Sequence, residues 1–251
     1  SPLRRDSPDV PPMPIKPYLQ LVRVPTLFTA AADSLAGWLL VGGSLAEPRG
    51  WLALALASVG IYAGGVVLND VFDAEVDHRE RPERPIPSGR VSRRRAALLG
   101  TALLALGVVL AAASGTRHGA TVAALLVGCV LAYDAGLKHT ALGPEVMGAC
   151  RGMNLLLGAS LSAQLGGPLL WTAAAAYALF VTGITWISRS EVEVGPSKNL
   201  LAGLVLQTAA VLTLAGVCLG INGLGPDGSV GSVSLQATSG VAVLLAIGLL
   251  V

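Results

Sequence analysis

Charged residues are scarce in this chain of 251 residues. Asp, Glu, Lys and Arg make up only 13% of it, whereas 53% of the residues are hydrophobic. A typical soluble domain carries about 25% charged residues. The composition and the mean hydropathy of +0.68 therefore exclude an ordinary water-soluble protein and indicate a polytopic membrane protein. We expect the lipid bilayer as its surroundings and no nucleic-acid partner.

Cysteines, aromatic residues and long polar segments are also few. Cys129, Cys150 and Cys218 lie apart in apolar runs, which argues against a disulfide framework or a zinc site. Aromatic residues make up 4% of the chain, so few are available to line a binding pocket. The longest polar interval, about residues 73–95, is too short to hold a soluble domain.

Apolar runs, in contrast, fill most of the sequence. A helix of about 18 to 23 apolar residues spans the core of a bilayer. Eight such runs can be placed, at about residues 24–45, 51–72, 95–114, 119–137, 144–165, 168–188, 198–220 and 233–251. We predict an all-α transmembrane bundle, with residues 1–16 as a disordered cytoplasmic arm and residues 17–251 as a single transmembrane domain.

Basic residues lie almost entirely on one side of this predicted bundle. When alternate connections are assigned to opposite sides, 15 of the 17 Lys and Arg residues fall on one side, opposite Arg49 and Arg117. Because basic residues are enriched in cytoplasmic loops, we expect the amino terminus and the even-numbered connections in the cytoplasm. The predicted location is the cell (plasma) membrane.

An acidic motif, NDVFDAEVD at residues 69–77, lies at the inner end of the second apolar run. At about 100° of rotation per residue, Asp70, Asp73 and Asp77 share one narrow helix face. Ionisable groups at membrane depth are costly unless they are paired, hydrated or bound to a cation. We therefore interpret three carboxylates on one face as a functional site.

The segment RPERPIPSGRVSRRR follows the motif. Its prolines prevent the second helix from continuing, so an arginine cluster that includes Arg84 and Arg90 stays near the carboxylates. Mutual neutralisation combined with topology-setting charge is one interpretation. The other is a site for Mg²⁺ and an isoprenyl diphosphate, because Mg²⁺ takes carboxylate and phosphate oxygens and arginine holds phosphate directly.

The pattern of Asn69, Asp70, Asp73 and Asp77, followed by RPERPIPSGRVS, resembles the first signature of the UbiA superfamily of intramembrane prenyltransferases. The resemblance implies a helical bundle, usually of nine helices, of which the ninth would follow Val251. It also implies two acidic motifs that bind Mg²⁺ and the diphosphate of a prenyl donor. The three aspartates would then be metal-binding and catalytic, and Asn69, Arg84 and Arg90 would contact the diphosphate.

The fourth connection contains Tyr133 and Lys138, a pair that resembles the Y-x-x-x-x-K element near the donor phosphates in that family. Both are candidate diphosphate ligands. An i, i+4 pair with Asp134 or a topological charge would also account for Lys138. Arg151 lies seven residues into an apolar helix and needs an anionic partner, which could be a phosphate or a motif carboxylate.

The second acidic motif departs from the family pattern. The family has a D-x-x-x-D type motif after the sixth helix, where this chain reads ITWISRSEVEVG and offers Glu191 and Glu193. On a continuous helix these two diverge by about 200°, so they share a metal only if the helix ends there. We predict that both bind metal, that Glu191 is catalytic and that Arg189 binds diphosphate. Alternatively, Glu193 pairs with Arg189. The substitution resembles the EboC-like subgroup of UbiA homologues.

Together these features predict a Mg²⁺-dependent prenyltransferase that ionises an isoprenyl diphosphate, stabilises the departing pyrophosphate electrostatically and transfers the prenyl group. The acceptor, a small molecule or a lipid, is not identified by the sequence. A terpene cyclase on the same scaffold would use the same ionisation without an acceptor. A non-enzymatic lipid carrier would bind the diphosphate lipid without turnover.

Overall fold

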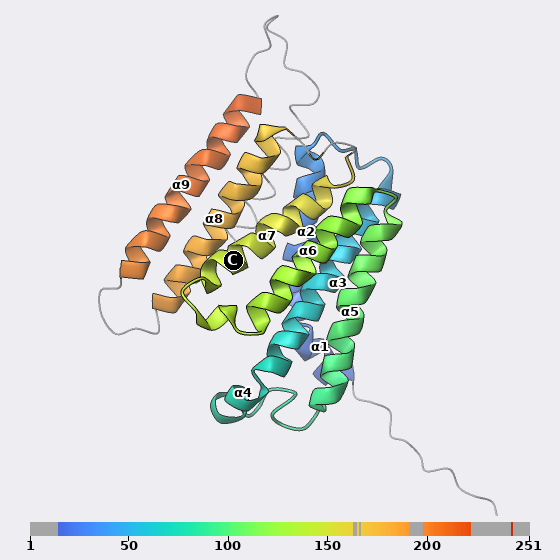
Figure 1. Cartoon of the computed structure of the whole chain (residues 1–251), viewed down its shortest axis with the longest axis vertical. Helices are drawn as coiled ribbons and strands as arrows, with labels where there is room; N and C mark the ends of the chain where they lie inside the picture. The colour runs from blue at the N-terminus through green and yellow to red at the C-terminus, as the bar shows by residue number, and fades with distance from the viewer. Residues whose placement is uncertain (1–14, 163–164, 166, 191–197, 222–241, 243–251) are drawn as a thin grey trace, which may run out of the picture.

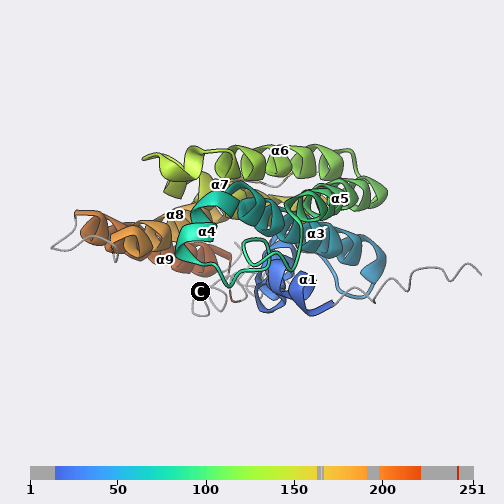
Figure 2. The ribbon, with the colours of Figure 1, turned by 90° about the horizontal axis from the view of Figure 1, so that it is seen from below.

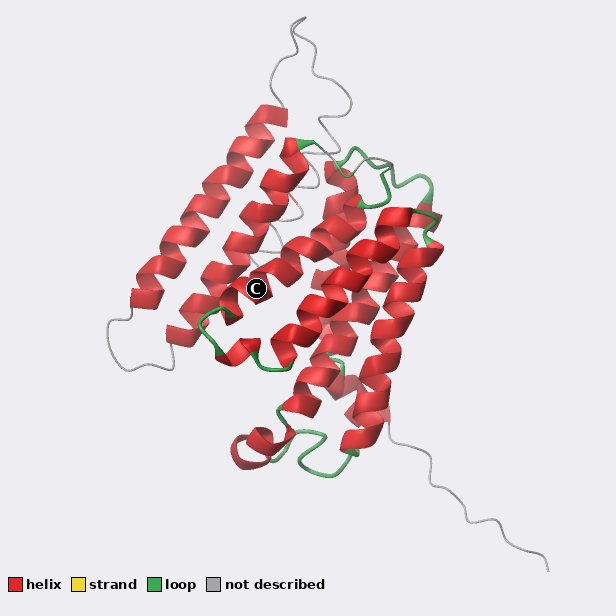
Figure 3. Ribbon diagram, viewed as in Figure 1, coloured by secondary structure: helices red, strands yellow, loops and turns green. Residues whose placement is uncertain are grey.

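The computed structural model describes residues 15–162, 165, 167–190, 198–221 and 242. Within these residues the regular structure is helical (Figures 1 and 3). The long helices are α2 (Leu27–Leu40), α3 (Pro48–Phe72), α5 (Arg93–Ala113), α6 (Arg117–Asp134), α7 (Gly143–Ala159), α8 (Pro168–Ser190) and α9 (Lys198–Ile221). The short elements are α1 (Ile15–Leu21), α4 (Ala74–Glu80) and the 3₁₀ turns η1 (Val24–Thr26) and η2 (Leu137–His139).

The seven long helices correspond to the first seven predicted spans, and the predicted all-α architecture is confirmed. By length and composition, α3, α5, α8 and α9 can each cross a membrane, and Val24–Leu40 forms a shorter apolar helix. The predicted span at 233–251 lies outside the described residues apart from position 242. The predicted arm also lies outside them, except that its last two residues begin α1.

Helices α3 and α7 hold the bundle together. Helix α3 packs against α2, α5 and α6, and α7 packs against α2, α6 and α8. Helix α9 lies along α8 at one edge of the bundle (Figure 1). In the view from below, the short helices α1 and α4 lie at the near end of the bundle (Figure 2). The acidic motif therefore leaves the membrane-spanning part at this end.

Small residues let these helices approach closely. A Cβ at Gly64 of α3 would lie 2.8 Å from the backbone oxygen of Gly100 on α5, and a Cβ at Gly158 of α7 would collide with the backbone of Ser34 on α2. Close backbone contact through small residues is typical of membrane helices, because lipid tails remove the usual hydrophobic driving force between them.

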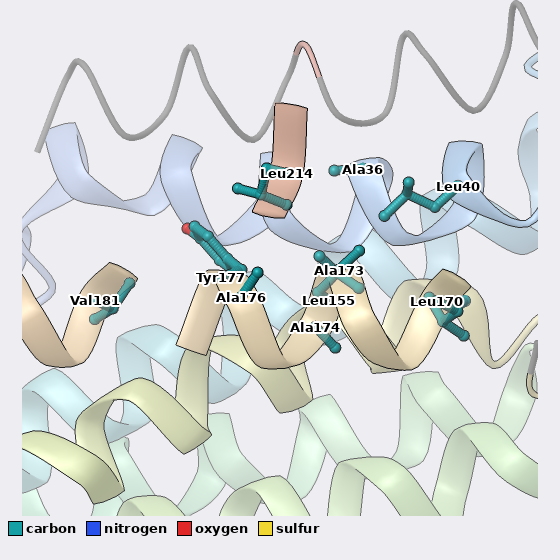
Figure 4. Packing of buried hydrophobic residues seen from close by; sticks show 11 residues of the cluster. Ala36, Leu40, Leu155, Leu170, Ala173, Ala174, Ala176, Tyr177, Val181 and Leu214 are labelled. Atoms are coloured by element: carbon teal, nitrogen blue, oxygen red, sulfur yellow. The ribbon is translucent and has the colours of Figure 1, made fainter. Parts of the chain in front are cut away.

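Two buried clusters fix the helices that carry the polar groups. One joins α2, α7, α8 and α9 around Tyr177 (Figure 4). The other joins α3, α5, α6 and α7 and includes Leu54, Ile61 and Leu104. Because α3 and α6 share this second cluster, these two helices are held side by side.

The chain breaks its helix in the middle of the acidic motif. Helix α3 ends at Phe72, and Asp73, with φ −84° and ψ 2°, lies between it and α4. The loop of residues 81–92 then returns the chain to α5 (green in Figure 3). Gly89 has a φ of 74° in this loop, a conformation that glycine adopts without steric cost. The prolines and this glycine thus return the chain so that Arg84 lies next to the motif.

Candidate active site

Local backbone geometry keeps the three motif aspartates near one another. The N–H of Asp73 donates to the carbonyl of Asn69 at 2.9 Å, and the N–H of Asp77 donates to the carbonyl of Asp73 at 2.8 Å. The helical spacing therefore continues across the break. Asp70 and Asp77 are 5% and 4% exposed, whereas Asp73 is partly exposed.

Arg84 joins the first and third aspartates. Its Nη1 lies 2.6 Å from Asp77 Oδ2 and 3.3 Å from Asp70 Oδ1. Arg84 comes from the 81–92 loop, so the Pro-rich segment returns a guanidinium to the motif as the sequence predicts. A single guanidinium that bridges two buried carboxylates has donors suited to phosphate oxygens as well.

Arg23 is a member of the cluster that the sequence analysis did not select. Its Nη2 lies 2.9 Å from Asp70 Oδ1. Its backbone, at φ 49° and ψ 55°, is left-handed, which among the described non-glycine residues occurs here alone. This conformation costs roughly 1–2 kcal/mol. In the sequence, Arg23 directly precedes the first apolar run, a place where membrane topology by itself also accounts for a basic residue.

Lys138 binds the middle of the motif. Its Nζ lies 2.6 Å from Asp73 Oδ1 and donates to Asn69 Oδ1 at 2.9 Å, and its side chain is only 8% exposed. Asn69 in turn donates to Asp73 Oδ2 at 3.1 Å. The structure thus brings the lysine of the Y-x-x-x-x-K element to the acidic motif, and the three aspartates are paired with three cationic side chains, those of Arg23, Arg84 and Lys138.

Asp134 is a further carboxylate at this place that the sequence analysis treated only as a partner for Lys138. It is 4% exposed, and its Oδ2 is buried without a hydrogen-bond partner. It interacts electrostatically with Lys138, Asp73 and Asp70. The preceding residue, Tyr133, is half-buried and interacts electrostatically with Asp134 and Asp73. The sequence feature that could have indicated Asp134 is its place as an acidic residue at the end of an apolar helix.

Three arginines predicted to bind diphosphate make their described contacts outside the ion-pair cluster of the motif. Arg90 is exposed and donates to Gln20 Oε1 at 2.9 Å and to the carbonyl of Glu83. Arg90 therefore fastens the 81–92 loop to α1. Because these partners are uncharged oxygens outside the motif, Arg90 is not part of the ion-pair cluster.

Arg189 is the second of them. Its Nη1 donates to the carbonyl of Thr140 at 2.9 Å and its Nη2 to the carbonyl of Lys138 at 2.5 Å. The guanidinium thus holds the backbone of η2 from the end of α8. This contact positions Lys138, which in turn meets Asp73.

Arg151 is the third, and the carboxylate that it contacts is that of Asp33 on α2, outside the acidic motif. Its Nη1 lies 2.9 Å from Oδ2 of Asp33, which is completely buried on α2. Tyr177 donates to Asp33 Oδ1 at 2.6 Å, and Asn154 donates to Asp33 Oδ2 at 3.2 Å. The guanidinium also lies over the ring of Tyr62, 5.7 Å from its centroid. A lone aspartate within the first apolar run was the signal for this partner.

Glu191 and Glu193 lie outside the described residues. The second half of the metal site therefore stays a prediction. Among the residues that are described, no three His, Cys, Asp or Glu side chains are close enough to hold a metal ion. The motif carboxylates are instead separated by Arg23, Arg84 and Lys138.

The donor set nevertheless fits Mg²⁺ bound together with a diphosphate. All the candidate ligands are hard oxygens, and Mg²⁺ usually takes one or two carboxylates, completed by phosphate oxygens and water. The unpaired Oδ2 of Asp134 is an additional buried acceptor at the same place. A diphosphate would give the cationic side chains a new partner and leave carboxylate oxygens for the metal.

Two surface hollows lie beside the elements that carry the motif. One, of about 580 Å³, is lined by residues of α1 and η1 that include Lys16, Gln20 and Arg23. The other, of about 360 Å³, lies between α4 and the following loop and includes Glu75 and Arg79.

The acidic motif, Arg84 of the 81–92 loop and the buried Lys138 lie together at one end of an intramembrane helical bundle, which we call the mouth. This combination defines the class of the protein. The model of the UbiA prenyltransferase family matches residues 30–251. The chain therefore belongs to the UbiA prenyltransferase family, as its first motif indicates.

Two curated relatives with the same name show the extent of the sequence similarity. The digeranylgeranylglyceryl phosphate synthase of Ignicoccus hospitalis is 39% identical over 155 residues, which cover 61% of this chain and 50% of that protein. The protein of the same name from Methanopyrus kandleri is 38% identical over 162 residues, covering 62% and 57%. The chain thus matches about half the length of these relatives.

Solved structures with the same fold include UbiA homologues from two archaea. The homologue from Archaeoglobus fulgidus bound to GPP and Mg²⁺ has a TM-score of 0.70 at 16% identity, with 93% of this chain and 98% of that one covered. The apo homologue from Aeropyrum pernix K1 has a TM-score of 0.65 at 20% identity, with 90% and 97% covered. At this level of identity the likeness establishes the fold, and it confirms the UbiA-type bundle.

Proposed function

We propose that this chain is an integral-membrane prenyltransferase that ionises an isoprenyl diphosphate with Mg²⁺ and transfers the prenyl group to an acceptor. The observation that carries the proposal is the division of the motif aspartates between Arg84 and Lys138, which lie 2.6 Å from Asp77 and Asp73. These two cations come from different loops, and both can turn to a diphosphate placed between them. The family and the names of the relatives support the same activity.

Each polar group at the mouth has a place in this reaction. Arg23, Arg84 and Lys138 bind the diphosphate oxygens, and Asn69 keeps the Lys138 ammonium in position. Asp70, Asp73 and Asp77 would hold the metal. When bound, Mg²⁺ supplies positive charge that stabilises the leaving diphosphate. Glu191 and Glu193 would contribute the opposite wall of the site, as the family pattern suggests.

The apolar helices then protect the reactive allylic cation from water. In the transfer, the carbon–oxygen bond to the diphosphate breaks and pyrophosphate leaves with the electron pair. The acceptor hydroxyl forms a new carbon–oxygen bond to the allylic carbon and loses its proton. The names of the relatives support an acceptor of the glyceryl phosphate class, with a lipid chain already attached.

We further infer that residues 17–251 act as one membrane domain in the plasma membrane, with the motif on the cytoplasmic side. The distribution of Lys and Arg supports this orientation. Helix α4 and the lower ends of α6 and α8 lie toward the same end of the bundle (Figure 1), so the polar mouth would face one aqueous compartment.

Purified protein incubated with Mg²⁺ and geranyl, farnesyl or geranylgeranyl diphosphate, with and without a prenylglyceryl phosphate, tests the function. We expect an ether product only when the acceptor is present, identified by mass spectrometry. Hydrocarbon or terpene alcohol formed without acceptor, above the level of uncatalysed hydrolysis, would indicate a cyclase. Tight donor binding without any product would indicate a lipid carrier, and either result would contradict the proposal.

A further inference from the structure

We propose that Asp134, at the end of α6, is a ligand of the divalent cation that binds with the diphosphate, an inference that rests on the proposed function. Neither the first acidic motif nor the altered second one includes this residue. Its carboxylate would add a metal ligand from a third segment of the chain, next to the Y-x-x-x-x-K lysine. The argument begins with the state of its two oxygens.

The Asp134 carboxylate is buried and only partly satisfied. The residue is 4% exposed, and Oδ2 has essentially no contact with solvent and no hydrogen-bond partner. Buried carboxylates in proteins are almost always hydrogen-bonded, paired or bound to a metal. An unpaired buried oxygen therefore indicates a partner that binds at this point.

The surroundings of Asp134 make a negative charge unfavourable unless a further cation is present. Asp134 is the last residue of α6, and the carboxyl end of a helix dipole repels anions. Asp73 and Asp70 act on the same carboxylate with the same sign of charge. An ionised carboxylate at this position therefore needs a positively charged partner.

Lys138 alone does not meet this need. Its ammonium interacts with Asp134, but it lies 2.6 Å from Asp73 Oδ1 and donates to Asn69 Oδ1. The described cluster holds four carboxylates, those of Asp70, Asp73, Asp77 and Asp134, against three cationic side chains, those of Arg23, Arg84 and Lys138. With all four carboxylates ionised, the cluster has one negative charge more than these cations balance, even before a diphosphate draws the cations away.

A divalent cation compensates this excess of negative charge better than another monovalent cation does. When Lys138 turns to a diphosphate oxygen, Asp73 and Asp134 both lose the ammonium that they share. Two carboxylates with phosphate oxygens and water form an ordinary Mg²⁺ coordination set. Asp134 would thereby supply an aspartate oxygen from α6. At the second motif, this chain has Glu191 and Glu193 where the family pattern has aspartates.

The test measures binding and needs no turnover. The full chain in detergent or nanodiscs is titrated with Mg²⁺ in the presence of labelled geranyl thiolodiphosphate, a donor analogue that does not ionise. The quantity compared is the free Mg²⁺ concentration at half-maximal analogue binding. For Asp134→Asn we expect this concentration to rise about 10- to 100-fold, the usual effect of losing a group that supports a metal.

Glu75→Gln is the matched control, because the Glu75 side chain on α4 is 89% exposed. It should leave the Mg²⁺ midpoint unchanged. An unchanged midpoint in Asp134→Asn would overturn the inference while leaving the proposed function intact. If the unaltered chain shows no Mg²⁺-dependent analogue binding, the proposed function fails, and the inference fails with it.

A second comparison separates a metal ligand from a residue that only neutralises Lys138. The Mg²⁺ midpoint of Lys138→Gln is compared with that of Lys138→Gln combined with Asp134→Asn. If Asp134 acts only through Lys138, the second change adds nothing, and the inference is overturned. If it binds the metal, the double variant shows the full additional rise. Asp134→Ser is measured beside Asp134→Asn, and circular dichroism with size-exclusion chromatography confirms that each variant is folded.

Discussion

The ammonium of Lys138 lies 2.6 Å from Asp73 Oδ1, and this contact joins η2 to the acidic motif between α3 and α4. Arg189 holds the same loop from α8 by donating to the carbonyl of Lys138. Three segments that are far apart in the sequence therefore meet at one mouth. The lysine is buried, so its charge is available to a ligand that reaches the motif and is shielded from bulk water.

Replacement of Lys138 by glutamine should lower kcat/KM for the prenyl diphosphate by about 10- to 100-fold. A hydrogen bond to a charged group contributes about 1.5–3 kcal/mol, and about 1.4 kcal/mol corresponds to a tenfold change. Initial-rate assays over a range of donor concentrations measure the effect. His139→Gln, an exposed neighbour in the same turn, is the control and should keep full activity. Equal rates for both variants would contradict a phosphate-binding role.

Removal of divalent cations with EDTA should abolish transfer, and added Mg²⁺ should restore it. Asp73→Asn should lower kcat by about 100-fold or more, in the range found when electrostatic stabilisation of a developing charge is lost. Product formation is measured by mass spectrometry at saturating donor. Glu75→Gln serves as the control for a nearby acid that is outside the ion-pair cluster. Full activity in EDTA, or in Asp73→Asn, would exclude a metal role for the motif.

Arg84→Ala should destabilise the folded protein by about 3 kcal/mol, because removing one partner of a buried ion pair leaves an uncompensated charge. Arg84 is the shared partner of Asp70 and Asp77, which are both buried. Thermal unfolding in detergent without ligand measures the change. Arg79→Ala on α4, where the side chain is exposed, should leave the midpoint in place. Identical midpoints for the two variants would show that the Arg84 contacts do not stabilise the fold.

Asp33→Ala should be among the most damaging single changes, with an expected loss of about 3–5 kcal/mol. The change would leave Arg151 buried without its carboxylate and remove the acceptor of the Tyr177 hydroxyl. Combining Asp33→Leu with Arg151→Met removes both charges and should recover most of the stability. Unfolding in detergent compares the three proteins. Failure of the double variant to recover would indicate that the pair has a role beyond mutual neutralisation.

Gly158→Ala should destabilise the bundle by about 1–3 kcal/mol, the usual cost of overpacking. The added Cβ would collide with the backbone of Ser34 and force α2 away from α7. Gly128→Ala on α6 is the matched control, because its Cβ would meet open space and alanine favours a helix by about 1 kcal/mol. Thermal unfolding that ranks the two variants in the opposite order would contradict the observed α2–α7 packing.

The fold was largely predictable because its main signal is local. A bilayer requires long apolar helices, and each of the seven predicted spans in the described part of the chain has its helix. The short helices α1 and α4 were missed, since neither has the length or the hydropathy of a span. The helical spacing of the aspartates also persisted across the break at Asp73, because the backbone hydrogen bonds continue through it.

The site was predicted less completely because its partners are chosen in three dimensions. The sequence indicated Lys138 and Arg84 as neighbours of the motif, and the structure places both there. It assigned Arg151 to the same site, whereas Asp33 holds this residue elsewhere in the bundle. It assigned no role to Asp134. A local pattern records that a charge is present, but it does not record which helix the charge faces.

The sequence by itself determined that the chain is a membrane bundle of the UbiA family, because bilayer thickness and a contiguous acidic signature are properties of neighbouring residues. Only the tertiary structure decided which cation holds which carboxylate and that the buried Oδ2 of Asp134 receives no hydrogen bond. Those outcomes depend on how α3 and α6 pack and on the contact of α8 with η2, which join segments distant in the chain.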